Sequence, residues 1–352
     1  MKKILFITSA LLDDPKRGTP IRIRNFIKQI EKENNVVIYH VNHEQNFWSQ
    51  IFQLRRVIKK DRPGVAMTAT DVDIDFPFWL KILTGVKIAV DLHGLNSAEM
   101  YFHGHMGKWK SWLLQQKINF QIRFFDLVFV VSPKLLDFYG PKIKQGVVIY
   151  GGVTDDDFYN GPIKSPEIFT IGYTGNFNPY QGIDEVLIAA GNIRRQNLFP
   201  FRLNLILSNG QKQVEDRLKE LNLLDITDLR FKVSHDEVPE LMAKSSVLII
   251  ARPSVPMTEY AFPSKLPEYL ATGIPVITTK VGPVEALLSD KDCALIISPD
   301  NVLVELEEKL VFLSKMTVEE RNSLGQKAVK LVRQSLTWDT IGHTINQSLK
   351  NI

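Results

Sequence analysis

Short apolar runs of strand length alternate with segments of helical periodicity from the first residues to beyond residue 290. Such alternation is typical of a parallel sheet with helices on both faces. In the first half, we predict strands at Ile4 to Thr8, Val36 to Tyr39, Val65 to Thr68, Lys87 to Leu92, Leu127 to Val131 and Val147 to Tyr150. A polar stretch follows, and we then predict strands at Phe169 to Tyr173, Arg202 to Leu207, Asp228 to Phe231, Val247 to Ile250, Pro275 to Thr279 and Ala294 to Ile297. The pattern predicts two doubly wound α/β domains.

The restart of the pattern also predicts where the domains begin and end. We expect a Rossmann-like domain over residues 1–153, a linker over 154–167 and a second Rossmann-like domain over 168–332. A chain of 352 residues is long enough for two domains of ordinary size. The last helical pattern runs from Val318 to Asn351 and contains Trp338.

Composition narrows the class of protein. Hydrophobic residues make up 44% and charged residues 23%, and no apolar run reaches the ~20 residues of a membrane span. A net charge of +4 is too small to indicate nucleic-acid binding on its own. The single cysteine, Cys293, excludes an internal disulfide, and the apolar N-terminus is too short for a secretory signal. We expect a cytoplasmic protein.

The most informative segment runs from Phe262 to Ile277 and reads as a short helix between two strands. Ser264 is a candidate N-cap, which places Lys265 and Glu268 on the first helical turn. Free backbone N–H groups at a helix start attract anions, and Lys265 adds a positive charge for a phosphate. Glu268 can accept hydrogen bonds from vicinal hydroxyls such as those of a ribose. These are the two requirements of a nucleotide diphosphate.

This segment is similar to the nucleotide-binding signature of retaining GT-B glycosyltransferases, the family 4-like or group 1 enzymes, and the resemblance covers nearly the whole chain. It implies two Rossmann-like domains facing a cleft, with residues 333–352 forming a helix that packs back on the first domain. It also implies metal-independent transfer of a sugar from a nucleotide-diphosphate donor to a polysaccharide, glycolipid or related acceptor, in cell-envelope synthesis. Donor contacts from this segment would come from Phe262, Ser264, Lys265, Leu266 and Glu268.

Two departures from the family pattern lie in the second half. The loop after Phe169 to Tyr173 offers Gly175 for a close approach to phosphate, but Asn176 and Gln181 occupy the positions of the family's basic pair. We therefore expect Arg252, which follows a predicted strand, to join Lys265 as a catalytic cation that stabilises the leaving diphosphate. The first of the family's two acidic residues falls on Tyr260, so its contact with the transferred sugar is an open question.

In the first half, His93 ends a predicted strand and matches a histidine that the family places near the donor sugar and phosphate. We expect it to act in catalysis. Gly18 and Thr19 follow the first strand and could touch an acceptor or the diphosphate. Arg22 could bind an acidic acceptor, but a solvated helix charge is the interpretation that we favour for it. Ser132 and the stretch Tyr150 to Val153 match family landmarks that we interpret as structural or hinge positions.

Several alternatives stay open at the level of sequence. Acidic triplets at Asp71 to Asp75 and Asp155 to Asp157 have metal-site spacing, as do His103 and His105, but no metal is our expectation. The stretches Phe47 to Lys60 and Lys108 to Phe125 mix cations with aromatic residues, which fits either an anionic membrane surface at the inner face of the membrane or ordinary half-buried helices. A sugar-nucleotide epimerase and a non-catalytic sugar-nucleotide-binding partner remain as competing functions.

Overall fold

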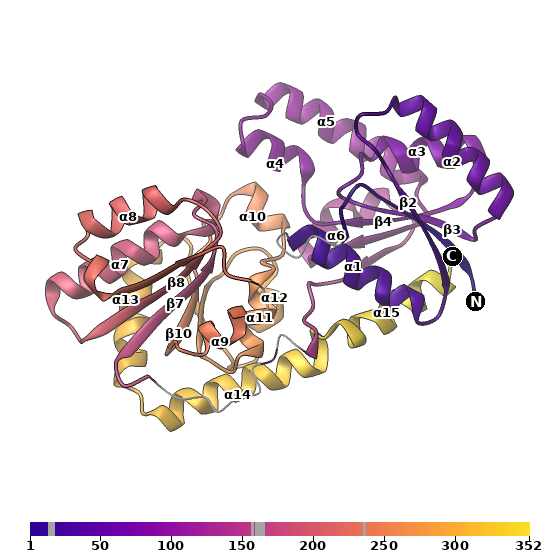
Figure 1. Ribbon diagram of the computed structural model, residues 1–352. Helices are drawn as coiled ribbons and strands as arrows, with labels where there is room; N and C mark the ends of the chain where they lie inside the picture. Colours follow the sequence, from indigo (N-terminus) through magenta and orange to yellow (C-terminus); the bar gives the residue numbers. More distant parts are fainter. Residues whose placement is uncertain (13–17, 156–157, 159–165, 235–236) are drawn as a thin grey trace. The chain divides into compact units, whose positions relative to one another are not determined.

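The computed structural model describes residues 1–12, 18–155, 158, 166–234 and 237–352 (Figure 1). The chain divides into two compact units. The first unit contains Met1–Gly151, Glu259–Phe262 and Trp338–Ile352, and the second contains Gly152–Thr258 and Pro263–Thr337. Each unit has its own parallel six-stranded sheet, so the predicted pair of α/β folds is confirmed.

The sheet of the first unit has the strand order β2-β1-β3-β4-β5-β6, and all neighbouring strands are parallel. Its strands are β1 (Lys3–Thr8), β2 (Asn35–His40), β3 (Val65–Ala69), β4 (Lys87–Leu92), β5 (Leu127–Val130) and β6 (Gly146–Val148). The helices of this unit are α1 (Gly18–Glu31), α2 (Phe47–Asp61), α3 (Asp75–Thr84), α4 (Asn96–Phe102), α5 (Lys108–Gln121), α6 (Pro133–Tyr139) and α15 (Trp338–Lys350).

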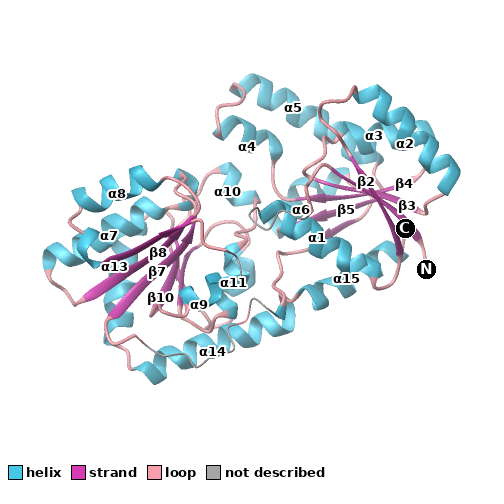
Figure 2. Cartoon of the chain, in the orientation of Figure 1, coloured by secondary structure: helices cyan, strands magenta, loops and turns pink. Residues whose placement is uncertain are grey.

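Strand periodicity explains why helices cover both faces of this sheet. Ile4 and Phe6 of β1 face a core that includes α1 and α15, whereas Leu5 and Ile7 face a second core with residues of α2, α3 and α6. Because successive side chains of a strand point to opposite faces, a strand buried on both faces is a continuous apolar run. Figure 2 shows α1 and α15 on one side of the sheet and α2 and α3 on the other.

The sheet of the second unit has the order β12-β11-β10-β7-β8-β9 and is also fully parallel. Its strands are β7 (Phe169–Gly175), β8 (Phe201–Leu207), β9 (Thr227–Phe231), β10 (Val247–Ile250), β11 (Val276–Thr279) and β12 (Leu295–Ile297). The helices are α7 (Ile183–Gln196), α8 (Gln211–Glu220), α9 (Val238–Met242), α11 (Lys265–Ala271), α12 (Val284–Leu288), α13 (Val302–Lys315) and α14 (Val318–Ser335), and α10 (Pro256–Tyr260) runs across the boundary of the units.

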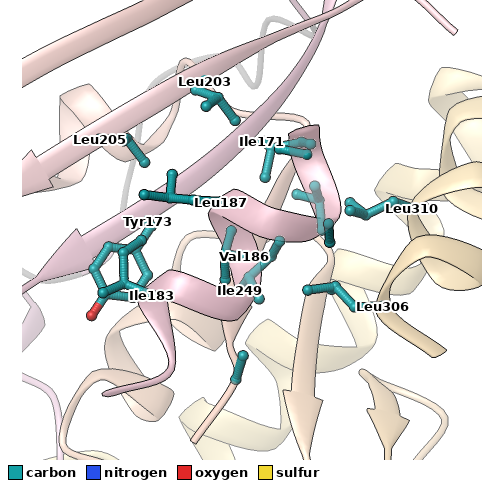
Figure 3. Close-up of a cluster of buried hydrophobic side chains, with 14 of the residues drawn as sticks. Ile171, Tyr173, Ile183, Val186, Leu187, Leu203, Leu205, Ile249, Leu306 and Leu310 are labelled. Carbon is teal, nitrogen blue, oxygen red and sulfur yellow. The ribbon is translucent and has the colours of Figure 1, made fainter. Parts of the chain in front are cut away.

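The core of the second unit lies between the sheet and two of its helices. Figure 3 shows Val186 and Leu187 of α7 beside Leu306 and Leu310 of α13, with all four side chains buried. Tyr173 belongs to the same cluster and is buried at the carboxyl-terminal part of β7. This core therefore holds in place the end of the strand from which the candidate site is built.

The helical pattern predicted from Val318 to Asn351 is two helices rather than one. A capping box of Thr317 and Glu320 starts α14, and the break falls at Leu336 and Thr337, where Leu336 is buried and Thr337 forms a β-bridge with Val153. The second helix, α15, packs on α1 in the first unit. Gly342 permits this close packing, because a Cβ atom there would lie 2.4 Å from Oε1 of Gln29.

Candidate functional site

The strand order of the second sheet locates its candidate ligand site. The chain runs from β7 outward to β9 and then crosses back to β10, which pairs with the other side of β7. In open α/β sheets, ligands bind outside the carboxyl ends of the strands at such a switch point. Asn176 follows β7 directly, and Arg252 lies two residues beyond the end of β10.

Lys265, the first residue of α11, reaches this switch point. Its Nζ donates a hydrogen bond of 3.0 Å to the Tyr173 hydroxyl and lies 4.2 Å from the centre of the Tyr173 ring. The hydroxyl in turn donates to the carbonyl of Asn176 at 3.0 Å. A Cβ atom at Gly175 would lie 2.3 Å from Nζ, so glycine is needed at the end of β7 for Lys265 to occupy this position. Lys265 and Gly175 therefore lie side by side at the end of β7.

The electrostatics of this cluster favour a bound anion. Burial and the positive charge of Arg252 lower the pKa of Lys265 to about 7, although Glu268 acts in the opposite direction. The side chain of Arg252 is only 7% exposed, and its backbone carbonyl accepts a hydrogen bond from Thr279. Charge interactions are strong in a partly dehydrated site, so two positive groups there attract an anion. A diphosphate has the charge to meet both.

Tyr269 fixes α11 against β7. Its hydroxyl accepts a hydrogen bond from the Thr174 N–H at 2.7 Å and donates one to the Thr174 carbonyl at 3.1 Å. Complete burial raises the pKa of this hydroxyl well above its usual range. Because Lys265 and Glu268 lie on the same helix, Tyr269 sets their distance from the end of β7. Tyr269 was not among the predicted site residues, although a tyrosine one position after Glu268 on a short buried helix needs a polar partner.

The start of α11 differs from the expectation in two respects. Ser264 occupies the N-cap position, but its backbone is already helical (φ −56°, ψ −29°) and its side chain makes no capping hydrogen bond. Leu266 has a fully buried side chain, and its N–H donates to the Pro263 carbonyl. The expected capping by Ser264 is therefore not observed, and the Leu266 N–H is used within the turn that begins at Pro263.

The loop after β7 brings polar rather than basic side chains to the switch point. The Oδ1 atom of Asn176 is buried and has no hydrogen-bond partner among the described residues. Gln181 ends a short 3₁₀ helix, and Gly182 follows it with φ +69°. A Cβ atom at Gly182 would lie 1.7 Å from the Ala251 carbonyl oxygen, so this glycine lets the loop pack against the end of β10.

The segment Glu259–Phe262 belongs to the first unit. The ring of Tyr260 lies 5.5 Å from that of Phe138, and Glu259 forms an ion pair with Lys134. Phe262 packs against Tyr150, with ring centres 5.4 Å apart. The rings of Tyr260 and Phe262 therefore pack on aromatic residues of the first unit, and the donor contacts considered for them stay predictions.

His93 lies directly after β4 and contacts a buried carboxylate. Its Nε2 is 2.8 Å from Oδ2 of Asp91, whose side chain is 1% exposed. Arg22 of α1 binds both oxygens of Asp91, at 3.0 and 2.9 Å, and also donates to the carbonyls of Ile149 and Tyr150. Burial alone would raise the pKa of Asp91, but the charge of Arg22 and the hydrogen bonds from Arg22 and His93 outweigh it and lower that pKa well below its usual range.

This arrangement corrects the expectation for Arg22. Its guanidinium is engaged in a buried ion pair, so it does not offer a free charge to an acidic acceptor. Gly18 and Thr19 begin α1, and their side chains lie outside the described part of the structure. Asp91 was not among the predicted site residues, although a carboxylate within a buried apolar strand is a signal that a cation must be nearby.

Other residues noted in the sequence have structural contacts. Asp71 accepts hydrogen bonds from Thr8 and from the N–H groups of Ser9 and Ala10, which fixes the first residues after β1. Asp156 and Asp157 lie outside the described residues. Ser132 caps α6 through the Leu135 N–H, as its structural interpretation predicted. Within the described residues, no three side chains of histidine, cysteine, aspartate or glutamate gather as metal ligands would.

Comparisons with known proteins agree with this architecture. Residues 157–331 match the family model of glycosyl transferases group 1. No protein with a curated description matches the chain. The fold is similar to that of sucrose-phosphate synthase from Thermosynechococcus elongatus, with a TM-score of 0.72 and 16% identity over 100% of this chain and 99% of that one.

Two further structures have the same fold. A glycosyltransferase from Rickettsia africae has a TM-score of 0.76 and 15% identity, over 99% of this chain and 98% of that one. Anabaena HepE, determined in complex with UDP-glucose, has a TM-score of 0.76 and 15% identity over 100% of both chains. Residues 157–331 thus form a domain of the glycosyl transferases group 1 family, within a chain that has the fold of GT-B glycosyltransferases over its whole length.

Proposed function

We propose that the protein is a retaining, metal-independent glycosyltransferase that moves a sugar from a nucleotide-diphosphate donor to a polysaccharide, glycolipid or related acceptor. The observation that carries the proposal is the pair of cations, Lys265 and Arg252, at the switch point of the second sheet. Nothing in this arrangement requires a divalent ion to neutralise the diphosphate, because two protein cations already lie at the carboxyl ends of β7 and β10. Retention is what the family resemblance implies.

The chemistry assigned to these residues follows from where negative charge develops. As the bond between the sugar and the diphosphate breaks, charge accumulates on the leaving phosphate oxygens, and fixed cations stabilise that state more than the ground state. Lys265 and Arg252 have this role. Glu268, three residues along α11, accepts hydrogen bonds from the ribose hydroxyls and orients the nucleotide.

The direct test is a transfer assay in the presence of EDTA. Radiolabelled sugar nucleotides, beginning with UDP-glucose because HepE was determined in complex with it, are incubated with the protein and a bacterial glycolipid extract. We expect label to move into the lipid fraction, and NMR of the product to show the anomeric configuration of the donor. Free sugar as the main product without an acceptor would favour an epimerase, and binding without transfer or hydrolysis would favour a non-catalytic partner.

We also propose that the first unit docks on an anionic membrane through the start of α5. Trp109 and Trp112 stack on one another with ring centres 4.9 Å apart, yet they are 69% and 49% exposed. Lys108 and Lys110 are exposed on the same turns, and α5 contains no acidic residue. Exposed aromatic rings beside cations are typical of interfacial helices.

The other basic and aromatic helix, α2, differs from α5. It buries Gln50, Ile51, Leu54 and Ile58, as a core helix would. Among the described helices, none has the length and apolarity to cross a bilayer.

Vesicle sedimentation tests this docking. We expect the protein to bind vesicles containing phosphatidylglycerol, and to bind phosphatidylcholine vesicles less. The double substitution Trp109→Ala and Trp112→Ala should weaken binding to the anionic vesicles by about tenfold or more. Phe312→Ala is the matched control, because Phe312 is 53% exposed on α13 of the second unit. Equal binding of the double variant and the control would contradict this surface.

A further inference from the structure

Asp91 contacts His93 as well as Arg22, and an ion pair with only a structural role would not need this second contact. Oδ2 of Asp91 is shared between Nε of Arg22, at 3.0 Å, and Nε2 of His93, at 2.8 Å. Asp91 lies in β4 and His93 directly follows the strand, and their contact shows that the two side chains lie on the same side. The buried carboxylate therefore has one neighbour that neutralises it and another that lies at the edge of the sheet where ligands bind.

The backbone of His93 is fixed by the same group of residues. Its N–H donates to the hydroxyl of Thr70 at 2.9 Å, and that hydroxyl donates to the Asp91 carbonyl at 3.0 Å. Arg22 is held in turn by the Tyr150 carbonyl and by the ring of Trp338, 5.8 Å from its guanidinium carbon. Contacts from four separate segments of the first unit thus define the position of one imidazole.

We propose that Asp91 and Arg22 are positioning residues for His93, and that they determine which of its ring nitrogens meets the substrate. An ionised carboxylate only accepts hydrogen bonds, so the Nε2 that faces it carries the proton in the neutral imidazole. Nδ1 is then an acceptor, and the substrate group that it meets must be a hydrogen-bond donor. This points to a hydroxyl of a bound sugar and not to a phosphate oxygen. The inference rests on the proposed function.

The role of Arg22 is to neutralise the buried carboxylate of Asp91. A carboxylate buried to this extent is costly without a cation. Arg22 supplies that cation from α1 through a bidentate contact, so His93 can act as a hydrogen-bonding group without being the sole partner of a buried charge. Arg22 therefore acts through Asp91 and does not touch the substrate.

The tautomer can be measured without any substrate. In protein labelled with ¹⁵N-histidine, long-range ¹H–¹⁵N correlation spectra identify the protonated ring nitrogen, and His93→Gln assigns the signals. We expect the Nε2–H form for His93 in the parent protein and a mixture of tautomers in the double variant Arg22→Met/Asp91→Leu. A parent protein with the Nδ1–H form would overturn the proposal, whether or not the protein transfers sugar.

Kinetics then separate a positioning role from a structural one. The double variant removes both charges together, so we expect it to fold, to bind sugar nucleotide as the parent does, and to lose about 10- to 100-fold in kcat. His93→Ala should lower kcat similarly, and combining it with the double variant should add nothing further. Additive losses, or an unchanged kcat in the double variant, would overturn the proposal. If that variant fails to fold, it is replaced by Asp91→Asn, which keeps the shape of the side chain. Asp91→Asn is then combined with His93→Ala in the same way.

Discussion

At the level of single residues, the sequence predicted which side chains would form the candidate donor site. It did not predict which other residues those side chains would contact. The pattern around Lys265 and Glu268 identified both residues and their place on the first turn of a helix. It did not reveal that Lys265 would lie on the ring of Tyr173, 92 residues earlier in the chain. Contacts of that kind depend on strand pairing, which a local pattern does not describe.

Substitution of the two α11 residues should affect different kinetic steps. Glu268→Ala removes an acceptor for the ribose hydroxyls, so we expect the Kd for the donor to rise about tenfold, as for one lost hydrogen bond to a charged group. Lys265→Ala removes stabilisation of the leaving group, and kcat should fall about 10²- to 10³-fold. Glu240→Ala and Lys244→Ala are matched controls on exposed positions of the same unit. Near-normal constants for both site variants would refute the assigned roles.

Donor binding should be accompanied by proton uptake at Lys265. In the empty protein the pKa of Lys265 is lowered to about 7 by burial and by Arg252. A bound diphosphate favours the charged amine, so at pH 8 binding should take up about one proton per donor, and the affinity should fall as the pH rises above 7. Calorimetry in two buffers of different ionisation enthalpy measures this uptake, which Lys265→Met should abolish. The same uptake in the variant would show that another group is responsible.

At the scale of elements, the apolar runs predicted all twelve strands within two residues of their observed bounds. They did so because strands buried on both faces are continuous apolar segments bounded by polar turns. The ends of helices were harder to predict. Ser264 has the chemistry of an N-cap, but the helical backbone at that residue prevents the capping geometry. The break between α14 and α15 also depends on a tertiary contact, the bridge of Thr337 to Val153.

The attachment of α11 to β7 makes a prediction about stability. Tyr269→Phe would leave the N–H and carbonyl of Thr174 without their buried hydroxyl partner. We expect a loss of about 1–3 kcal/mol in the free energy of unfolding, and a lower melting temperature in calorimetry. Tyr101→Phe, at a position that is 52% exposed, is the control and should melt like the parent. Equal melting temperatures for the two variants would mean that this pair of hydrogen bonds contributes little.

At the scale of the whole molecule, the sequence predicted two α/β units but not how their segments are shared. The chain passes from the first unit to the second at Gly151 and Gly152, inside the stretch that we had interpreted as a hinge. The return of Glu259–Phe262 to the first unit was not predicted. A four-residue segment has no periodicity of its own, and its contacts with Phe138 and Tyr150 connect residues more than 100 positions apart.

The central claim is that the second unit binds a nucleotide-diphosphate sugar through Lys265 and its neighbours without a metal ion. Thermal unfolding with UDP-, GDP-, ADP- and TDP-sugars, each with EDTA and with magnesium, tests it most directly. We expect at least one of these donors to raise the melting temperature equally with and without magnesium, since a ligand at ~100 times its Kd adds ~2.7 kcal/mol of stability. We also expect that Lys265→Ala weakens this effect and Lys244→Ala does not. Stabilisation by no donor, or only with magnesium, or equally in both variants, would contradict the claim.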